Sequence, residues 1–231
     1  MSMTLLFLTL SAFAVDPAPL GRVLAADVVA GKVDYAQVRA NAELEAWLAQ
    51  AASATGPQNH AFYLNTYNAL VLRALASRPA LPAKVTDIAG FFDATPHKVA
   101  GEMLTLNALE TRIRAWGDPR IHFALNCGAR SCPPLQSSAF PENDAALDKV
   151  LESLTASFLD GPGVVVDDAK HQIQLSALFD WYRADFGEAD KGIGFILKHL
   201  TDPAERARVQ AAVAAGYAIS YQPYDWMPNS R

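Results

Sequence analysis

The stretch HAFYLNTYNALVLRALASRP, residues 60–79, constrains the fold more than any other part of the chain. It follows the helix-breaking segment TGPQN at 55–59, consists largely of helix-forming residues, and ends at Pro79. Its apolar residues occur on every side of the helical wheel rather than along one stripe. A helix that is apolar all round has to be enclosed by the rest of the protein. The sequence therefore predicts a central, buried helix from about His60 to Ser77.

Two asparagines interrupt the apolar surface of this predicted helix. Asn65 and Asn68 are three residues apart, so they lie on one face of it. A buried carboxamide without partners costs about 1–3 kcal/mol, so we expect both to form hydrogen bonds. In the structural interpretation, which we favour, they hold neighbouring loops. In the functional one they line a cleft, where one of them orients a histidine or a substrate carbonyl.

The remaining elements indicate the fold class. Residues 34–52 predict one or two amphipathic helices divided near Ala40–Asn41. Strands come in hairpins and helices in blocks, without the alternation of a βαβ protein, so we predict an α+β domain. Further helices are expected over 105–118, with Asn107 as N-cap, and over 143–161, 176–187 and 202–216. Strands are expected over 97–106 (a hairpin), 121–126, 164–175 (a hairpin) and 217–226.

Length and charge bound the function. A chain of 231 residues is long enough for one sizeable core or two small domains, and no linker or internal repeat divides it. The net charge of −5 offers no attraction to phosphate backbones, which excludes nucleic acid as the predicted partner. No basic amphipathic stretch indicates a membrane surface. We therefore predict one globular domain and leave its oligomeric state open.

The first residues resemble a signal peptide. An apolar run extends from Thr4 to Phe13 and ends in the small-x-small pattern Ala12-Phe13-Ala14, which is typical of a cleavage site. The run has roughly half the length of a membrane-spanning helix. The segment before it contains no Lys or Arg, and the alternatives are a buried N-terminal helix or a mis-assigned start. We expect residues 1–14 to be removed and residues 15–231 to be exported to the periplasm or outside the cell, without stable membrane insertion.

The segment HFALNCGARSCPPL, residues 122–135, contains both cysteines of the chain. As part of a strand, His122 and Cys127 would face opposite sides roughly 17 Å apart, unless the strand ends early and the chain turns back at Gly128. Cys132 precedes a proline, which predicts a helix N-cap, and the nearby Arg130 would also lower a thiol pKa. Cys132, or failing it Cys127, is therefore the predicted nucleophile if either cysteine is catalytic.

A catalytic thiol also needs a base and a group that orients the base. His122 is the leading base, with His60 in reserve, and Asn65, Asn68 or Asp180 would orient it. In the alternative interpretation the two cysteines of an exported chain form a disulfide. Closing that six-residue loop would stabilise the fold by about 2 kcal/mol, and His122 would then be a core histidine. We favour the disulfide slightly for the resting state.

Other chemistries receive less support. The spacing CxxxxC is a weak redox signal. Two cysteines and His122 could supply three zinc ligands, but no second Cys or His pair stands at ligand spacing, so we predict no metal and no cofactor. In FDWYRADFG, Asp180 and Asp185 could be catalytic carboxylates, although anchoring of a helix by its aromatic residues, Trp181, Tyr182 and Phe186, is favoured. The closing YDWMPN is interpreted as a latch in which Asp225 binds backbone amides and Asn229 closes a turn.

Four segments, in this order along the chain, resemble the motifs of the domain of unknown function 547 family: FYLNTYNAL, IHFALNCGARSCPPL, LFDWYRADFG and YDWMPN. That family occurs in bacterial exported proteins and in plant proteins. The similarity runs from about Asp34 to Asn229, nearly the whole predicted mature chain. The family often has a histidine near the position of Thr111, so that histidine has no role in this chain. The resemblance implies the domain and leaves the reaction open.

Two functions follow as hypotheses. The first is a thiol-dependent hydrolase or acyl-transfer enzyme that acts on a peptide or small amide. In it Cys132 or Cys127 attacks the carbonyl, His122 moves the proton, and Asn65 or Asn68 holds the imidazole or the oxyanion. The second is a non-catalytic binding or scaffold module with a structural Cys127–Cys132 disulfide. Either way the partner is an unidentified peptide or small molecule.

Overall fold

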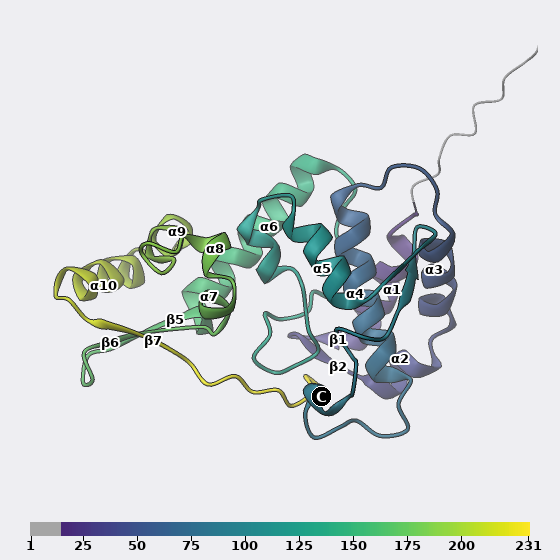
Figure 1. Ribbon diagram of the computed structural model, residues 1–231, viewed down its shortest axis with the longest axis horizontal. Coiled ribbons are helices and arrows are strands. Elements are labelled where there is room, and N and C mark those ends of the chain that lie inside the picture. The colour runs from purple at the N-terminus through teal and green to yellow at the C-terminus, as the bar shows by residue number, and fades with distance from the viewer. Residues whose placement is uncertain (1–14) are drawn as a thin grey trace, which may run out of the picture.

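The computed structural model describes residues 15–231, so the predicted signal peptide lies outside the described residues (Figure 1). The helices are α1 (Ala18–Asp27), α2 (Tyr35–Ala40), α3 (Ala42–Ser53), α4 (His60–Ala76), α5 (Leu106–Arg114), α6 (Asp144–Phe158), α7 (Leu178–Trp181), α8 (Arg183–Phe186), α9 (Ile193–His199) and α10 (Pro203–Ala214), together with the short helices η1 (Val85–Asp87), η2 (Pro119–Phe123) and η3 (Leu159–Gly163). The strands are β1 (Val28–Val29), β2 (Lys32–Val33), β3 (His97–Val99), β4 (Glu102–Leu104), β5 (Val164–Asp167), β6 (Gln172–Leu175) and β7 (Ala218–Tyr221). The predicted α+β class is confirmed.

Helix α4 is the central element that the sequence predicts. It begins because the Asn59 side chain accepts a hydrogen bond from the Phe62 amide at 2.8 Å, which caps the first turn. Most of its residues are buried, and α2, α3 and α5 pack against it (Figure 1). The predicted division of residues 34–52 is also confirmed, since α2 ends at Ala40 and Asn41 caps α3.

The two asparagines of α4 form the hydrogen bonds that their burial requires. Asn68 donates to the Ala124 carbonyl and accepts from the Asn126 amide, both at 2.9 Å. Asn65 binds Phe140 in the same two-way manner, at 3.0 and 2.8 Å. An irregular backbone segment lacks the hydrogen-bond partners that a helix or a sheet provides, and each carboxamide supplies such partners here. The asparagines hold the segment between η2 and α6 against the central helix.

A second apolar cluster lies beside the first. It gathers residues of η2, β5, β6 and the helices α7–α10, with Phe123 and Phe179 among its most buried members. Strand β6 pairs antiparallel with β5 and parallel with β7, so Ile173 lies opposite Val166 and Ile219. Leu154 of α6 packs against both clusters and joins them.

The chain after β7 returns to the first cluster, as Figure 1 shows in yellow. The Arg130 amide donates to the Met227 carbonyl at 2.8 Å, and the Asn229 amide donates to the Gly128 carbonyl at 2.9 Å. The Asp225 carboxylate accepts from the Met227 amide at 2.9 Å, as predicted for the closing motif. The C-terminal segment is therefore fixed against the loop that carries the cysteines.

Three local predictions are wrong. Residues 121–126 do not form a strand, because Asp118 accepts from the Arg120 amide and Pro119 takes the first helical position, which starts helix η2. Asn107 is not an N-cap, since Thr105 caps α5 by accepting from the Ala108 amide at 3.1 Å. No helix follows Cys132, because the next helix, α6, starts only at Asp144.

Within residues 15–231, none of the helices combines the length and the apolar character that crossing a bilayer demands.

Replacing the Asn68 carboxamide tests its structural role. Asn68→Ala leaves a buried carbonyl and a buried amide unpaired, so we expect it to lower the free energy of unfolding by about 2–4 kcal/mol. Asn143→Ala is the matched control, because Asn143 only caps the exposed start of α6 and its loss costs about 1 kcal/mol. Urea denaturation followed by circular dichroism measures both. A cost for Asn68→Ala no larger than that of the control would contradict the assignment.

Candidate functional site

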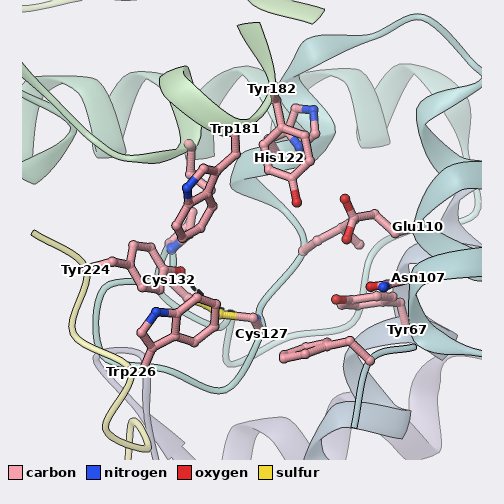
Figure 2. A pocket seen from close by; sticks show the side chains of 14 residues that line it. Tyr67, Asn107, Glu110, His122, Cys127, Cys132, Trp181, Tyr182, Tyr224 and Trp226 are labelled. Carbon is pink, nitrogen blue, oxygen red and sulfur yellow. Dashed lines mark hydrogen bonds between the residues drawn. A yellow bond between two sulfur atoms is a disulfide. The ribbon is translucent and has the colours of Figure 1, made fainter. Parts of the chain in front are cut away.

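A cavity of about 340 Å³ lies where the two apolar clusters and the C-terminal segment meet. Side chains from α4, α5, η2, the cysteine loop, α7 and the C-terminal segment line it. Figure 2 shows Trp181, Tyr224 and Trp226 on one side of the cavity, and Glu110, Asn107 and Tyr67 on the other. We call these two sets the aromatic wall and the polar wall.

The aromatic wall is a cluster of three rings from distant parts of the chain. The ring centroid of Trp181 lies 4.7 Å from that of Tyr224 and 5.7 Å from that of Trp226. The Trp226 carbonyl accepts from the Val85 amide at 2.9 Å, which fixes its backbone. Trp181 remains 46% exposed, although a ring of its size normally gains by burial. The anchoring role predicted for Trp181 is therefore wrong, whereas Phe186 does anchor α8, being buried in the second cluster.

The polar wall places one carboxylate in the cavity. Glu110 and Asn107 are three residues apart on α5, so they project from the same face. Burial raises the pKa of Glu110, and the charge of Asp185 adds to this, while a hydrogen bond to Tyr182 and the attraction of Arg114 oppose it. Burial also raises the pKa of Tyr67 well above its usual range. Tyr67 therefore stays protonated and is able to donate a hydrogen bond into the cavity.

His122 lies at the top of the cavity, held by a carboxylate and an arginine. Its Nε2 atom is 2.7 Å from Oδ2 of Asp185, and its ring stacks on Tyr182 with 3.9 Å between the centroids. Arg114 donates two hydrogen bonds to Asp185, at 2.8 and 3.0 Å. Asp185 thus takes the orienting role that we assigned to Asn65, Asn68 or Asp180.

The protonation state of His122 follows from its burial. Burial lowers the pKa of His122 to about 4, even though the hydrogen bond and charge of Asp185 favour the protonated ring. The pKa of Asp185 is itself lowered, chiefly by its hydrogen bonds with Arg114. The neutral ring donates its one N–H, on Nε2, to the Asp185 carboxylate. Nδ1 is then an acceptor, and it has no hydrogen-bond partner among residues 15–231.

The two cysteines form a disulfide, with 6.1 Å between their Cα atoms. The Tyr224 hydroxyl lies 3.2 Å from Sγ of Cys127 and 3.1 Å from Sγ of Cys132. Gly128, between them, has φ +81°, and a Cβ there would overlap Leu75 of α4. The loop therefore depends on this glycine, and its sulfurs form the floor of the cavity (Figure 2).

The structure brings three of the five predicted site residues together. His122, Cys127 and Cys132 all line the cavity. Asn65 and Asn68 do not line it; their carboxamides bind the backbone at Phe140 and Ala124 instead. His60, the reserve base, stacks on Trp116 with 3.9 Å between the ring centroids, away from the cavity.

Sequence reasoning missed the walls of the site. The sequence places Glu110 in the helix expected over 105–118 and Tyr67 in the buried helix, without marking either as a site residue. The signal that could have found the aromatic wall is the density of aromatic residues next to acidic ones in FDWYRADFG and YDWMPN. Within residues 15–231, no group of three or more His, Cys, Asp and Glu side chains is arranged to hold a metal ion.

The depressed pKa of His122 predicts a pH-dependent stability. The unfolded chain binds a proton at His122 below about pH 6.5, whereas the folded chain binds it only near pH 4, so stability falls as the pH drops through this window. The contribution is on the order of 3 kcal/mol. Urea denaturation between pH 7 and pH 4 gives the free energy of unfolding at each pH. The contribution of His122 is the difference between wild type and His122→Asn in how steeply this free energy falls with pH. His60→Gln, a change of an exposed histidine outside the cavity, is the control and should keep the His122 contribution; an unchanged pH dependence in His122→Asn would refute the assignment.

The comparisons with known proteins agree with the motifs. Residues 51–159 match the family model described as "Protein of unknown function, DUF547". This stretch includes α4, α5, η2, the disulfide loop and α6, while Trp181, Tyr224 and Trp226 lie beyond it. No curated protein and no solved structure matches the chain. The resemblance to the domain of unknown function 547 family is therefore supported over residues 51–159.

Proposed function

We propose that this domain is a binding module that holds a small organic ligand in the cavity between the aromatic and polar walls. The observation that carries the proposal is the pairing of a partly exposed aromatic cluster with a polar face across a cavity of about 340 Å³. Cavities of this size, mostly apolar with a few convergent polar groups, are the usual form of ligand sites. In this function the disulfide is structural: it shapes the floor and takes no part in chemistry.

The state of the site supports binding over catalysis. Both sulfurs are joined, so neither is a thiolate, and the thiolate is the nucleophilic form of cysteine. The Nε2 atom of His122 is engaged by Asp185 rather than by a sulfur. The polar wall supplies hydrogen bonds and the aromatic wall supplies contact area, which together are sufficient for recognition without a reaction.

A thiol-dependent hydrolase is the second candidate, because both sulfurs and His122 line the same cavity. It requires that a dithiol first reduce the disulfide. One cysteine thiolate would then attack an amide carbonyl, His122 Nδ1 would accept the thiol proton and pass it to the leaving amine, and water would hydrolyse the thioester. The substrate would be a peptide or a small amide.

Export is part of the proposal. A disulfide persists in the periplasm or outside the cell, and the N-terminal segment resembles a signal peptide. When the full-length chain is expressed in a bacterium that secretes proteins, we expect the mature product to start at Val15. Mass spectrometry of the purified protein decides the matter, and a soluble product that retains Met1 would refute export.

Ligand-observed NMR with a library of small neutral, cationic and anionic compounds tests the binding function. We expect binders whose signal is lost in Trp181→Ala, because that change removes part of the aromatic wall. Met103→Ala is the control, since Met103 is an exposed apolar residue on β4 outside the cavity. If no compound in the library binds in a Trp181-dependent way, the binding function is wrong.

Thiol measurements separate the two functions. As a binding module, the folded protein shows no free thiol before reduction, and Cys127→Ser and Cys132→Ser lower stability equally, by about 2 kcal/mol. As a hydrolase, the reduced protein has one cysteine that reacts with iodoacetamide at an apparent pKa well below about 8.5. In His122→Asn the apparent pKa of that cysteine would return to the ordinary range of a thiol. If both thiols react slowly with iodoacetamide, at rates that do not change in His122→Asn, the hydrolase is excluded.

A further inference from the structure

We propose that the ligand of this cavity is an organic cation, an ammonium or quaternary ammonium compound, held between the Glu110 carboxylate and the aromatic wall. The inference rests on the proposed binding function and names the class of ligand. It is carried by the charges and rings that line the cavity.

The cavity contains one carboxylate that forms no ion pair among the described residues. Glu110 is the only Asp, Glu, Lys or Arg side chain among the described residues that line it. Within residues 15–231, no Lys, Arg or His forms an ion pair with Glu110, and the nearby Arg114 is paired with Asp185. A half-buried carboxylate without a cationic partner is costly, and a cation in the cavity would remove that cost. The charge therefore selects against anions.

The opposite wall also favours a cation. Aromatic faces carry a negative partial charge and attract ammonium groups within about 6 Å, with Trp the most effective ring. The aromatic wall has two Trp rings and one Tyr ring, clustered within 4.7–5.7 Å of one another. A ligand between the walls thus meets a carboxylate on one side and three aromatic rings on the other, a setting that suits a cation with apolar substituents.

A neutral ligand fits this site less well. A sugar can stack an apolar face on the aromatic wall and donate hydroxyl hydrogen bonds to Glu110, but it leaves the charge of that carboxylate without a counter-ion. A neutral apolar ligand would cover Glu110 without pairing it. The cation is the class that satisfies both walls.

The proposal predicts that binding depends on pH. A bound cation favours the charged form of Glu110, whose pKa is raised in the free protein, chiefly by burial. The other groups that face Glu110 are Tyr67, Tyr182, Arg114 and Asp185, and none of them changes its charge between pH 5 and pH 8, since their shifts move them further from that range. His122 titrates near pH 4. Affinity for a cation should therefore fall as the pH drops through the pKa of Glu110.

Two ligands, each titrated into the mature chain with its disulfide intact and measured by calorimetry, test the ligand class. They are choline and its neutral analogue 3,3-dimethylbutan-1-ol, in which carbon replaces the charged nitrogen. We expect choline to bind at least about tenfold more tightly. Glu110→Gln should reduce this preference, because only the aromatic wall then favours the charged ligand, and Glu142→Gln, a change of an exposed residue outside the cavity, should keep it in full. The wild-type protein provides a readout that needs no variant: choline affinity falls as the pH is lowered from 7 through the raised pKa of Glu110, while the affinity of the neutral analogue stays constant.

The outcomes are distinct. If the neutral analogue binds as tightly as choline or more tightly, the proposal of a cationic ligand is wrong. It is also wrong if the affinity for choline does not change with pH. Neither result contradicts the proposed binding function. If neither compound binds while the NMR library yields neutral or anionic ligands that depend on Trp181, the cation is again overturned. If the library is empty as well, the binding function itself fails.

Discussion

The two hydrogen bonds between the Asn68 carboxamide and the backbone at Ala124 and Asn126 are the interaction on which the site depends. They hold an irregular segment against a helix that is otherwise apolar. His122 belongs to helix η2, just before Ala124, and Cys127, just after Asn126, begins the disulfide loop. One buried amide therefore sets the distance between the imidazole and the sulfurs. A regular strand would have supplied its own partners and placed these side chains on opposite faces.

A second constraint joins the two apolar clusters. Arg114 belongs to α5, Asp185 to α8 and His122 to η2, so their hydrogen bonds connect elements of both clusters beside the cavity. The ring of Tyr182 stacks on His122, and the Arg114 guanidinium lies 5.1 Å from the centroid of the same ring. Tyr182 is thus fixed from two directions, and its position sets one border of the polar wall.

The parts of the fold that depend on local pattern could be predicted from the sequence. The all-round apolar face of α4, the break before Asn41 and the β5–β6 hairpin follow from periodicity and turn residues. The 121–126 segment could not, because its apolar run resembles a strand while the Asp118-Pro119 pair starts a helical turn. The cavity is harder still to predict, since Glu110, Trp181 and Trp226 meet only through tertiary packing. The spacing of these three residues in the sequence does not show that they lie close together, and each stands in a local pattern that is typical of helix capping or helix anchoring.

The distribution of charge explains why the cavity keeps an unpaired carboxylate. Arg114 is the cation near enough to influence Glu110, yet its donors are directed at Asp185 in a two-bond arrangement. Asp185 in turn is needed to hold the neutral His122 ring in one orientation. Pairing Arg114 with Glu110 instead would leave Asp185 and His122 without their partners beside the second cluster, at a cost of several hydrogen bonds. The fold therefore uses Arg114 for structure, and within residues 15–231 the carboxylate that lines the cavity is left without an ion pair.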